Sequence, residues 1–333
     1  MPTPDKTAPM VKLAIRNYDS LWPLAMGDVR AEGVDLRIER SANALDRALK
    51  DPAVDGGEIS FARHIQRLAN GEKSRWIEIP AYVMRGFTQR CIYVRRDSKL
   101  VDAADLAGKR IGTNEWPASG NTWTRAMIRE RGVALDTIRW TVGKVSVNYK
   151  LPPNDDLPSG VAFQSPDRTL LDMLLEGDLD AIMAPWPPDG FHDPGSGVRR
   201  LYVDFRAAER AYWQRTHVYP VRHIVGIRRD LVERHPWIVR GVYDALDASR
   251  HAATKAQREM PEAPPWSMAE WEETVDLMGE DFQPYGTGPS NRPMIAALCD
   301  ELLAQGFLRR AVDPDRVFAE WEELMDREGV VHG

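Results

Sequence analysis

The chain has 333 residues, of which 43% are hydrophobic and 28% charged, with a formal net charge of -6. This composition is ordinary for a globular protein, and the length is comfortable for two domains. The acidic balance without a basic block argues against a nucleic-acid partner, and no apolar run reaches the length of a membrane span.

The N-terminal sequence MPTPDKTAPMVKLAIRNYD lacks the apolar core of a signal peptide, so we expect a cytoplasmic protein. Cys91 and Cys299 lie far apart in the sequence and match no metal or redox spacing. We expect two buried, reduced thiols.

The first hundred residues alternate between strand and helix patterns. We predict strands near 11–15, 33–39, 58–61, 76–83 and 91–94, and helices near 21–26, 42–49 and 61–68. Such βαβα alternation is typical of a parallel sheet flanked by helices.

The stretch LAGKRIGTNEWPASGNTWTRAMIRERG at 106–132 predicts a strand, a polar turn and an amphipathic helix. Glu115 and Trp116 lie in the turn, and the small polar residues from Ser119 to Thr122 are predicted to cap the helix. A helix N-terminus of this kind can bind a carboxylate or phosphate. The alternative is an ordinary strand–helix loop with a good cap.

A strand at 138–142, a Pro-rich excursion at 151–160, a helix at 170–175 and a strand at 181–183 follow. The next loop, PWPPDG, carries Trp186, which is either the wall of a cleft or a loop anchor. The chain then continues with a strand at 223–228 and helices at 236–254, 268–278, 293–304 and 314–325.

These elements predict an α/β protein with two lobes and a ligand cleft between them. Residues 1–110 would begin the first lobe, residues 111–221 would form an inserted second lobe, and residues 222–333 would complete the first. This is the architecture of two-lobed binding proteins.

Several stretches carry a resemblance to a known family. They are EISFARHI at 58–65, RGFTQRCIYV at 85–94, GTNEWPASGNTW at 112–123, the long block from Arg200 to Trp237, and EDFQPYG at 280–286. The chain resembles the 4,5-dihydroxyphthalate decarboxylase family, within the type II periplasmic-binding-protein fold. That resemblance implies a cytoplasmic, cofactor-independent decarboxylase of a hydroxylated aromatic acid.

Two positions depart from the family pattern. Thr88 and Gln89 follow Phe87, where the family has a second basic residue, and Trp186 stands where it tends to have another. The lost positive charge favours a monocarboxylate or an uncharged aromatic ligand over a dicarboxylate.

Decarboxylation of such an acid needs an anion-binding group, a proton donor and an apolar wall. Arg85 is the candidate anion-binding residue, because a guanidinium binds a carboxylate through two parallel hydrogen bonds. His223 is the candidate acid, since imidazole titrates near neutral pH. Glu115 would orient His223 or accept a phenolic proton.

Each candidate has an alternative interpretation. Arg85 could be a solvated surface residue, His223 a structural histidine and Glu115 a residue that stabilises the helix start. His217 and His64 are weaker candidates for the acid. His217, His223 and a carboxylate could ligate a metal, but their spacing matches no compact motif; we predict no metal and no cofactor.

The resemblance and the predicted strand ends together give a set of substrate-binding residues: Asn17, Tyr18, Ser60, Trp116, Ser119, Asn121, Thr122, Trp186 and His217. The expected ligand is a small aromatic acid, and the sequence is compatible with a homo-oligomer. The competing hypothesis is a solute-binding protein or sensor that uses the same cleft without chemistry.

Overall fold

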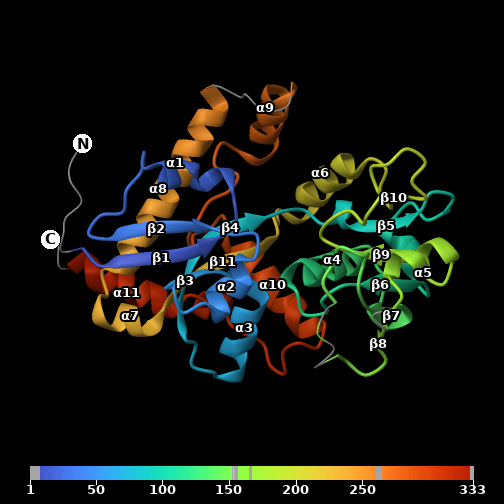
Figure 1. Cartoon of the computed structure of the whole chain (residues 1–333), viewed down its shortest axis with the longest axis horizontal. Helices are drawn as coiled ribbons and strands as arrows, with labels where there is room; N and C mark the ends of the chain where they lie inside the picture. Colours follow the sequence, from blue (N-terminus) through green and yellow to red (C-terminus); the bar gives the residue numbers. More distant parts are fainter. Residues whose placement is uncertain (1–7, 152, 154–156, 165–166, 260–264, 331–333) are drawn as a thin grey trace. The chain divides into compact units, whose positions relative to one another are not determined.

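The computed structural model describes residues 8–151, 153, 157–164, 167–259 and 265–330. The chain divides into two compact units. The first comprises Met1–Arg85, Val221–Cys299 and Arg310–Gly333, and the second comprises Gly86–Pro220 and Asp300–Arg309. Each unit has its own sheet (Figure 1).

The sheet of the first unit brings several strand ends to one edge. Its order is β2 (Asp35–Arg40), β1 (Met10–Ile15), β3 (Gly56–Ser60), β11 (Val221–Arg228) and β4 (Trp76–Arg85). β1 is parallel to β2 and β3, whereas β11 is antiparallel to β3 and β4. The carboxyl ends of β1 to β4 therefore meet at the edge where β11 begins.

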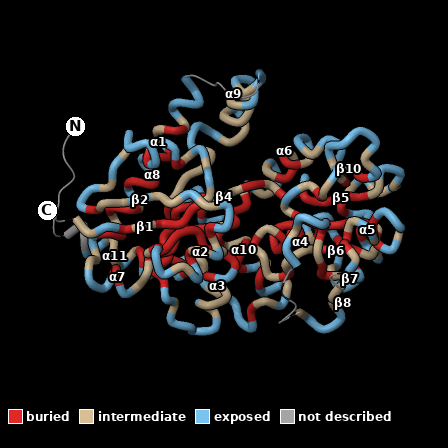
Figure 2. The backbone as a smooth tube through the Cα atoms, viewed as in Figure 1, coloured by how far each residue is buried: buried red, intermediate tan, exposed pale blue. Residues whose placement is uncertain are grey.

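All helices of the first unit but one bury apolar residues. They are α1 (Trp22–Met26), α2 (Ala44–Lys50), α3 (Phe61–Asn70), α7 (Arg229–Arg234), α8 (Ile238–Glu259), α9 (Ser267–Met278), α10 (Arg292–Ala304) and α11 (Ala319–Val330). α8 buries Ile238, Val242 and Leu246, which recur every four residues on one helix face. Figure 2 shows buried residues along the central strands, whereas α9 buries none of its residues.

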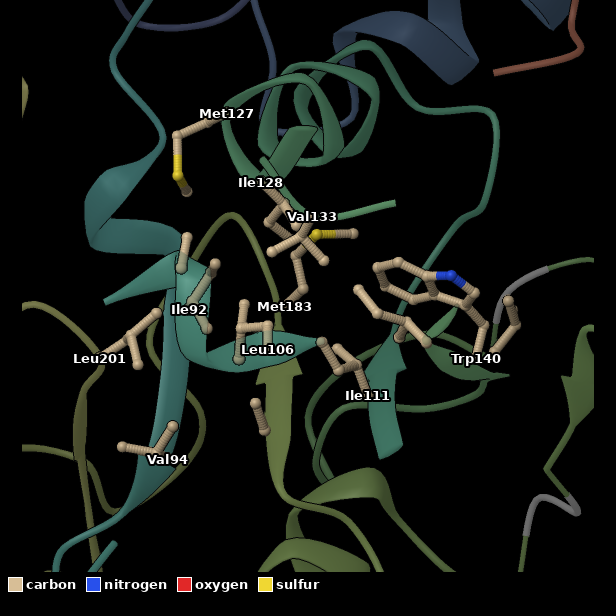
Figure 3. Packing of buried hydrophobic residues seen from close by; sticks show 14 of the residues in the cluster. Ile92, Val94, Leu106, Ile111, Met127, Ile128, Val133, Trp140, Met183 and Leu201 are labelled. Atoms are coloured by element: carbon tan, nitrogen blue, oxygen red, sulfur yellow. The ribbon is translucent and has the colours of Figure 1, made fainter. Parts of the chain in front are cut away.

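The second unit has a mixed sheet of six strands. Its order is β10 (Val198–Arg200), β5 (Ile92–Arg95), β9 (Ala181–Met183), β6 (Arg110–Thr113), β7 (Arg139–Val142) and β8 (Ala162–Phe163). Its helices are α4 (Ser119–Glu130), α5 (Leu170–Glu176), α6 (Phe205–Thr216) and the end of α10. Figure 3 shows the core that Ile92, Ile111, Trp140 and Met183 from four strands build with Met127 of α4.

The two units divide the chain after Arg85 and after Pro220, whereas the sequence placed boundaries at 110 and 221. Residues 86–110 belong to the second unit, because β5 pairs with β9 and β10. Residues 300–309 join it as well, since Glu301 and Gln305 bind the Arg129 and Arg125 side chains of α4 at 2.8 Å.

The predicted elements are found with shifts of a few residues at their ends, except for the last predicted helix. The helix predicted at 314–325 is a 3₁₀ turn at Pro314–Arg316 followed by α11. The helices α6 and α7 and the short strands β8 and β10 were not predicted. Cys91 and Cys299 are buried, as expected. In the described part of the chain, no helix is long and apolar enough to cross a membrane.

The glycine pair Gly56–Gly57 lets β3 lie between its two neighbouring strands. A Cβ on Gly57 would lie 2.1 Å from the backbone oxygen of Ala14 in β1, and its φ of +147° is rarely adopted by L residues. A backbone atom of a paired strand cannot move aside as a flexible side chain can.

We therefore expect Gly57→Ala to lower the free energy of unfolding by about 3 kcal/mol or more, because it overpacks the sheet centre. Gly288→Ala is the matched control, since a Cβ there meets no atom within 4 Å; it should change stability by less than about 0.5 kcal/mol. Urea unfolding of both variants measures the difference. Equal stability of Gly57→Ala and the wild type would contradict the tight packing.

Candidate active site

The strand ends of the first unit gather five of the sequence-predicted residues. Asn17 and Tyr18 follow β1, Ser60 ends β3, Arg85 ends β4 and His223 lies near the start of β11. The ladder pairs His223 with Ser60 and with Met84, next to Arg85. Polar side chains at the carboxyl ends of parallel strands are typical of ligand sites in α/β proteins.

Glu58 is the centre of this group, although the sequence did not point to it. Its side chain has no exposed surface. Oε1 accepts hydrogen bonds from Tyr18 Oη and Arg16 Nη1, both at 2.6 Å, and from His223 Nδ1. Oε2 accepts the backbone N–H of Arg16 at 3.1 Å. We call Arg16, Tyr18, Glu58 and His223 the Glu58 cluster.

Strand geometry explains why Glu58 and His223 meet. Glu58 lies two residues before Ser60 on β3, and His223 lies two residues before Val225, the partner of Glu58, on β11. Residues two apart on a strand share a face, so the two side chains are diagonal neighbours on one side of the sheet. The hydrogen bond then joins residues 165 positions apart in sequence.

The cluster keeps Glu58 ionised. Burial alone would raise the pKa of Glu58, yet the hydrogen bond and charge of His223, with Arg16 and Tyr18, lower this pKa to about 2. Burial and the charge of Glu58 raise the pKa of Tyr18, so its phenol stays a hydrogen-bond donor.

The same contacts orient the imidazole of His223. Because Glu58 is an acceptor, Nδ1 carries a proton and donates a hydrogen bond to the carboxylate. Nε2 has no hydrogen-bond partner among the residues that the structure describes. The pKa of His223 is lowered, chiefly because the ring is buried. The Glu58 carboxylate acts in the opposite direction and raises this pKa, whereas Arg16 and Arg222 lower it further. The ring can therefore exchange a proton at Nε2.

Arg85 is held by a loop of the same unit. Its Nη2 donates to the backbone oxygen of Pro284 at 2.5 Å and to Asn291 Oδ1 at 2.6 Å, and its guanidinium lies 4.8 Å from the ring centre of Tyr82. The register of β4 against β11 is irregular between Ile79 and Arg85, a segment of the strand that contains Pro80. Bulges of this kind commonly re-aim side chains beside functional sites.

Two other predicted residues of this unit have local roles. Ser60 caps α3 by accepting the N–H of Arg63 at 3.4 Å. Asn17 is exposed and accepts a hydrogen bond from Arg40 at 3.2 Å. His64, a weaker candidate for the acid, is buried between Glu78 and the backbone oxygen of Val317.

The remaining predicted residues belong to the second unit. The residue that caps α4 is Ala118, which makes no side-chain hydrogen bond, so the predicted capping by Ser119 to Thr122 is wrong. These residues form the first turn instead. Ser119, Asn121 and Thr122 are buried, and Asn121 Nδ2 binds the Asn114 side chain and the Glu115 backbone oxygen.

Glu115 lies in the turn that Asn121 holds. The carboxylate that contacts His223 is Glu58 of its own unit, so the orienting role expected for Glu115 is filled by another residue.

The aromatic residues of the second unit divide between core and surface. Trp116 is buried against Trp140, with ring centres 5.5 Å apart, and Arg125 lies 4.2 Å above its ring. The ring of Trp186 is largely exposed, and its backbone oxygen accepts the Tyr149 hydroxyl at 2.9 Å. His217 is exposed and ends α6 with a left-handed φ of 51°.

Two residues of the cluster were missed, and little in the sequence could have found them. Glu58 in GGEIS fits a solvent-facing strand position, and Arg16 is one of many arginines. The one usable signal was position: Glu58 lies in, and Arg16 directly after, a strand that was already predicted to end at the site. Within the described residues, no three His, Cys, Asp or Glu side chains come together as a metal site.

Comparison with known proteins identifies relatives of this chain. No family model matches the sequence. The chain is 29% identical over 321 residues to a 4,5-dihydroxyphthalate decarboxylase of Comamonas testosteroni, covering 92% of this chain and 96% of that protein. It is 31% identical over 210 residues to a 4,5-dihydroxyphthalate decarboxylase of Pseudomonas putida, covering 61% of this chain and 81% of that protein.

Solved structures agree with the fold. A putative periplasmic sulfonate-binding protein of Methylobacillus flagellatus has a TM-score of 0.50 at 13% identity, covering 96% of each chain. A mutant of the desulfurization enzyme DSZB, bound to biphenyl-2-sulfinic acid, has a TM-score of 0.50 at 16% identity, covering 96% of this chain and 99% of that one. At these identities the likeness concerns the fold alone. The chain belongs to the 4,5-dihydroxyphthalate decarboxylase family, a family of carbon–carbon lyases built on the type II periplasmic-binding-protein fold.

Proposed function

We propose that this protein decarboxylates a hydroxylated aromatic carboxylic acid of the 4,5-dihydroxyphthalate type without a cofactor. The observation that carries the proposal is His223, whose Nδ1 is held by the buried Glu58 carboxylate while Nε2 has no hydrogen-bond partner within the described residues. The membership of the chain in a decarboxylase family supports the same reaction.

The imidazolium of His223 is the proton donor in this mechanism. A ring hydroxyl of the substrate supplies electron density to the carbon that bears the carboxylate, and that carbon takes the proton from Nε2. The bond to the carboxylate then breaks, its electron pair restores the aromatic ring, and CO2 leaves. His223 remains as a neutral imidazole with Nδ1–H bound to Glu58, and solvent returns the proton.

Arg85 is the proposed anion-binding residue. The Pro284 and Asn291 oxygens fix one end of its guanidinium, which orients the group before the substrate arrives. Such preorganisation reduces the entropy lost on binding. The two departures at Thr88–Gln89 and Trp186 favour a substrate with one carboxylate, so monocarboxylates belong in the substrate panel beside the dicarboxylate.

The test of the function is CO2 release from purified protein with 4,5-dihydroxyphthalate, 3,4-dihydroxybenzoate, 4-hydroxybenzoate and benzoate, with and without a metal chelator. We expect turnover of at least one hydroxylated acid, none of benzoate, and no effect of the chelator. Tight binding of an aromatic acid without turnover of any would favour the solute-binding alternative.

We expect His223→Asn to bind the substrate normally and to lose turnover by about 10²–10⁴-fold, the usual contribution of a positioned general acid. Calorimetric binding and steady-state kinetics separate the two effects. His251→Asn is the matched control, because His251 is an exposed histidine of the same unit that lies outside the predicted site, and it should keep wild-type turnover. Normal turnover in His223→Asn would remove His223 from the mechanism.

Arg85→Ala should weaken binding and turnover (kcat/KM) by a similar factor, because a salt bridge to the carboxylate exists already in the ground state. It should also lower the melting temperature, since two hydrogen bonds to the 284–291 loop are lost. Asn291→Ala, which removes one of those bonds and keeps the cation, should lower the melting temperature with less effect on affinity. Unchanged affinity in Arg85→Ala would leave Arg85 as a structural residue only.

A further inference from the structure

His223 lies between two side chains of opposite charge. Glu58 Oε1 contacts Nδ1, and Arg16 Nη1 lies 3.1 Å from the same atom. Arg16 and Glu58 also bind each other at 2.6 Å, with 28% of the Arg16 side chain and none of the Glu58 side chain exposed. The three groups come from β11, from β3 and from the residue that follows β1.

We propose that Arg16 and Glu58 act as an opposed pair of tuning residues, in which Glu58 stabilises the imidazolium of His223 and Arg16 makes the loss of its proton possible. That the proton goes to a substrate rests on the proposed function. The charge relation itself is a property of the first unit alone.

The argument begins with the cost of burying Glu58. A carboxylate without exposed surface must be paired, since an uncompensated buried charge costs several kcal/mol. If His223 were its only cation, every proton lost from His223 would leave that charge unpaired. The imidazolium would then be too stable to act as an acid near neutral pH.

Arg16 removes this difficulty because a guanidinium remains protonated throughout the physiological pH range. Its side chain and its backbone N–H both bind Glu58, and Tyr18 adds a third donor at 2.6 Å. Glu58 therefore stays paired in either state of His223. The ring can lose its proton and regain it while the carboxylate stays ionised.

The remaining groups around His223 do not reverse this balance. Arg222 on β11 is a further cation that lowers the pKa of His223. Tyr18 stays neutral, because burial raises its pKa. On β4 the residue paired with His223 is Met84, and Arg85 follows it. Among the largest influences on the pKa of His223, Glu58 is thus the anion and Arg16 and Arg222 are the cations.

The two charges predict shifts of opposite sign. Glu58→Gln removes the opposite charge, so the pKa of His223 should fall by at least about one unit. Arg16→Gln removes a like charge and leaves Glu58 dependent on His223, so this pKa should rise by at least about one unit. Glu58→Gln keeps the side-chain length and one acceptor oxygen, whereas Arg16→Gln shortens the side chain and leaves a neutral amide donor. If Arg16 and Glu58 had a structural role only, the two variants would not shift the pKa of His223 in opposite directions.

The measurement is an NMR titration of imidazole-labelled protein without ligand, with the His223 signal assigned by its loss in His223→Asn. In the wild type we expect a pKa below the ordinary value of about 6.5. Tyr18→Phe, which removes a donor from Glu58 without changing any charge, should raise the pKa by less than Arg16→Gln. Shifts of the same sign in the two charge variants, or none, would overturn the proposal.

If a charge variant does not fold, the wild type and Tyr18→Phe still decide. A wild-type pKa above 6.5, or a fall in Tyr18→Phe, would contradict the opposed pair. A parallel measurement follows kcat for 4,5-dihydroxyphthalate against pH, where the alkaline limb should move to lower pH in Glu58→Gln and to higher pH in Arg16→Gln. Opposite NMR shifts without any turnover would overturn the proposed function alone, whereas turnover without NMR shifts would overturn the tuning pair alone.

Discussion

A fully buried carboxylate fixes the arrangement of the strand ends in the first unit. Glu58 has no exposed surface, so each of its oxygens must accept hydrogen bonds from the protein. Those donors come from the residues after β1 and from His223 of β11. A slip of one residue in either strand would turn these side chains to the other face of the sheet. The register of three strands and the charge of the site therefore depend on the same contacts.

The sequence predicted the sheets better than their partition between the units. Apolar alternation identified β1, β3, β4 and β11, because each is buried and bounded by turn residues. It missed α6, in which only Glu209 and Tyr212 are buried, since so little burial leaves almost no apolar period. The predicted boundary near residue 110 left β5 in the first lobe, because the apolar pattern of a strand does not indicate which sheet it joins. Pairing partners are a tertiary property that local pattern does not contain.

For the candidate site, the sequence located the strand ends and the histidine but not the group that orients it. Glu115 was the natural choice, because it lies in a turn beside a helix start. Glu58 lies within a strand, where an acidic residue normally faces solvent. Its burial depends on Arg16 and on a strand that begins 163 residues later in the chain. Trp116 was likewise placed at the ligand site from its loop position, whereas the structure buries it beside Arg125 and Trp140.

The separation of β3 from β11 has a consequence for how the chain is made. During synthesis β3 emerges with β1 and β2, but its other neighbour follows only after the whole segment 86–220. Until then β3 has an open edge, and open edges pair readily with other chains. Glu58 opposes such pairing, because a foreign strand would bury its carboxylate without the hydrogen bond that His223 supplies in the finished sheet. We therefore expect the residue that organises the finished sheet also to disfavour pairing of the nascent strand with other chains.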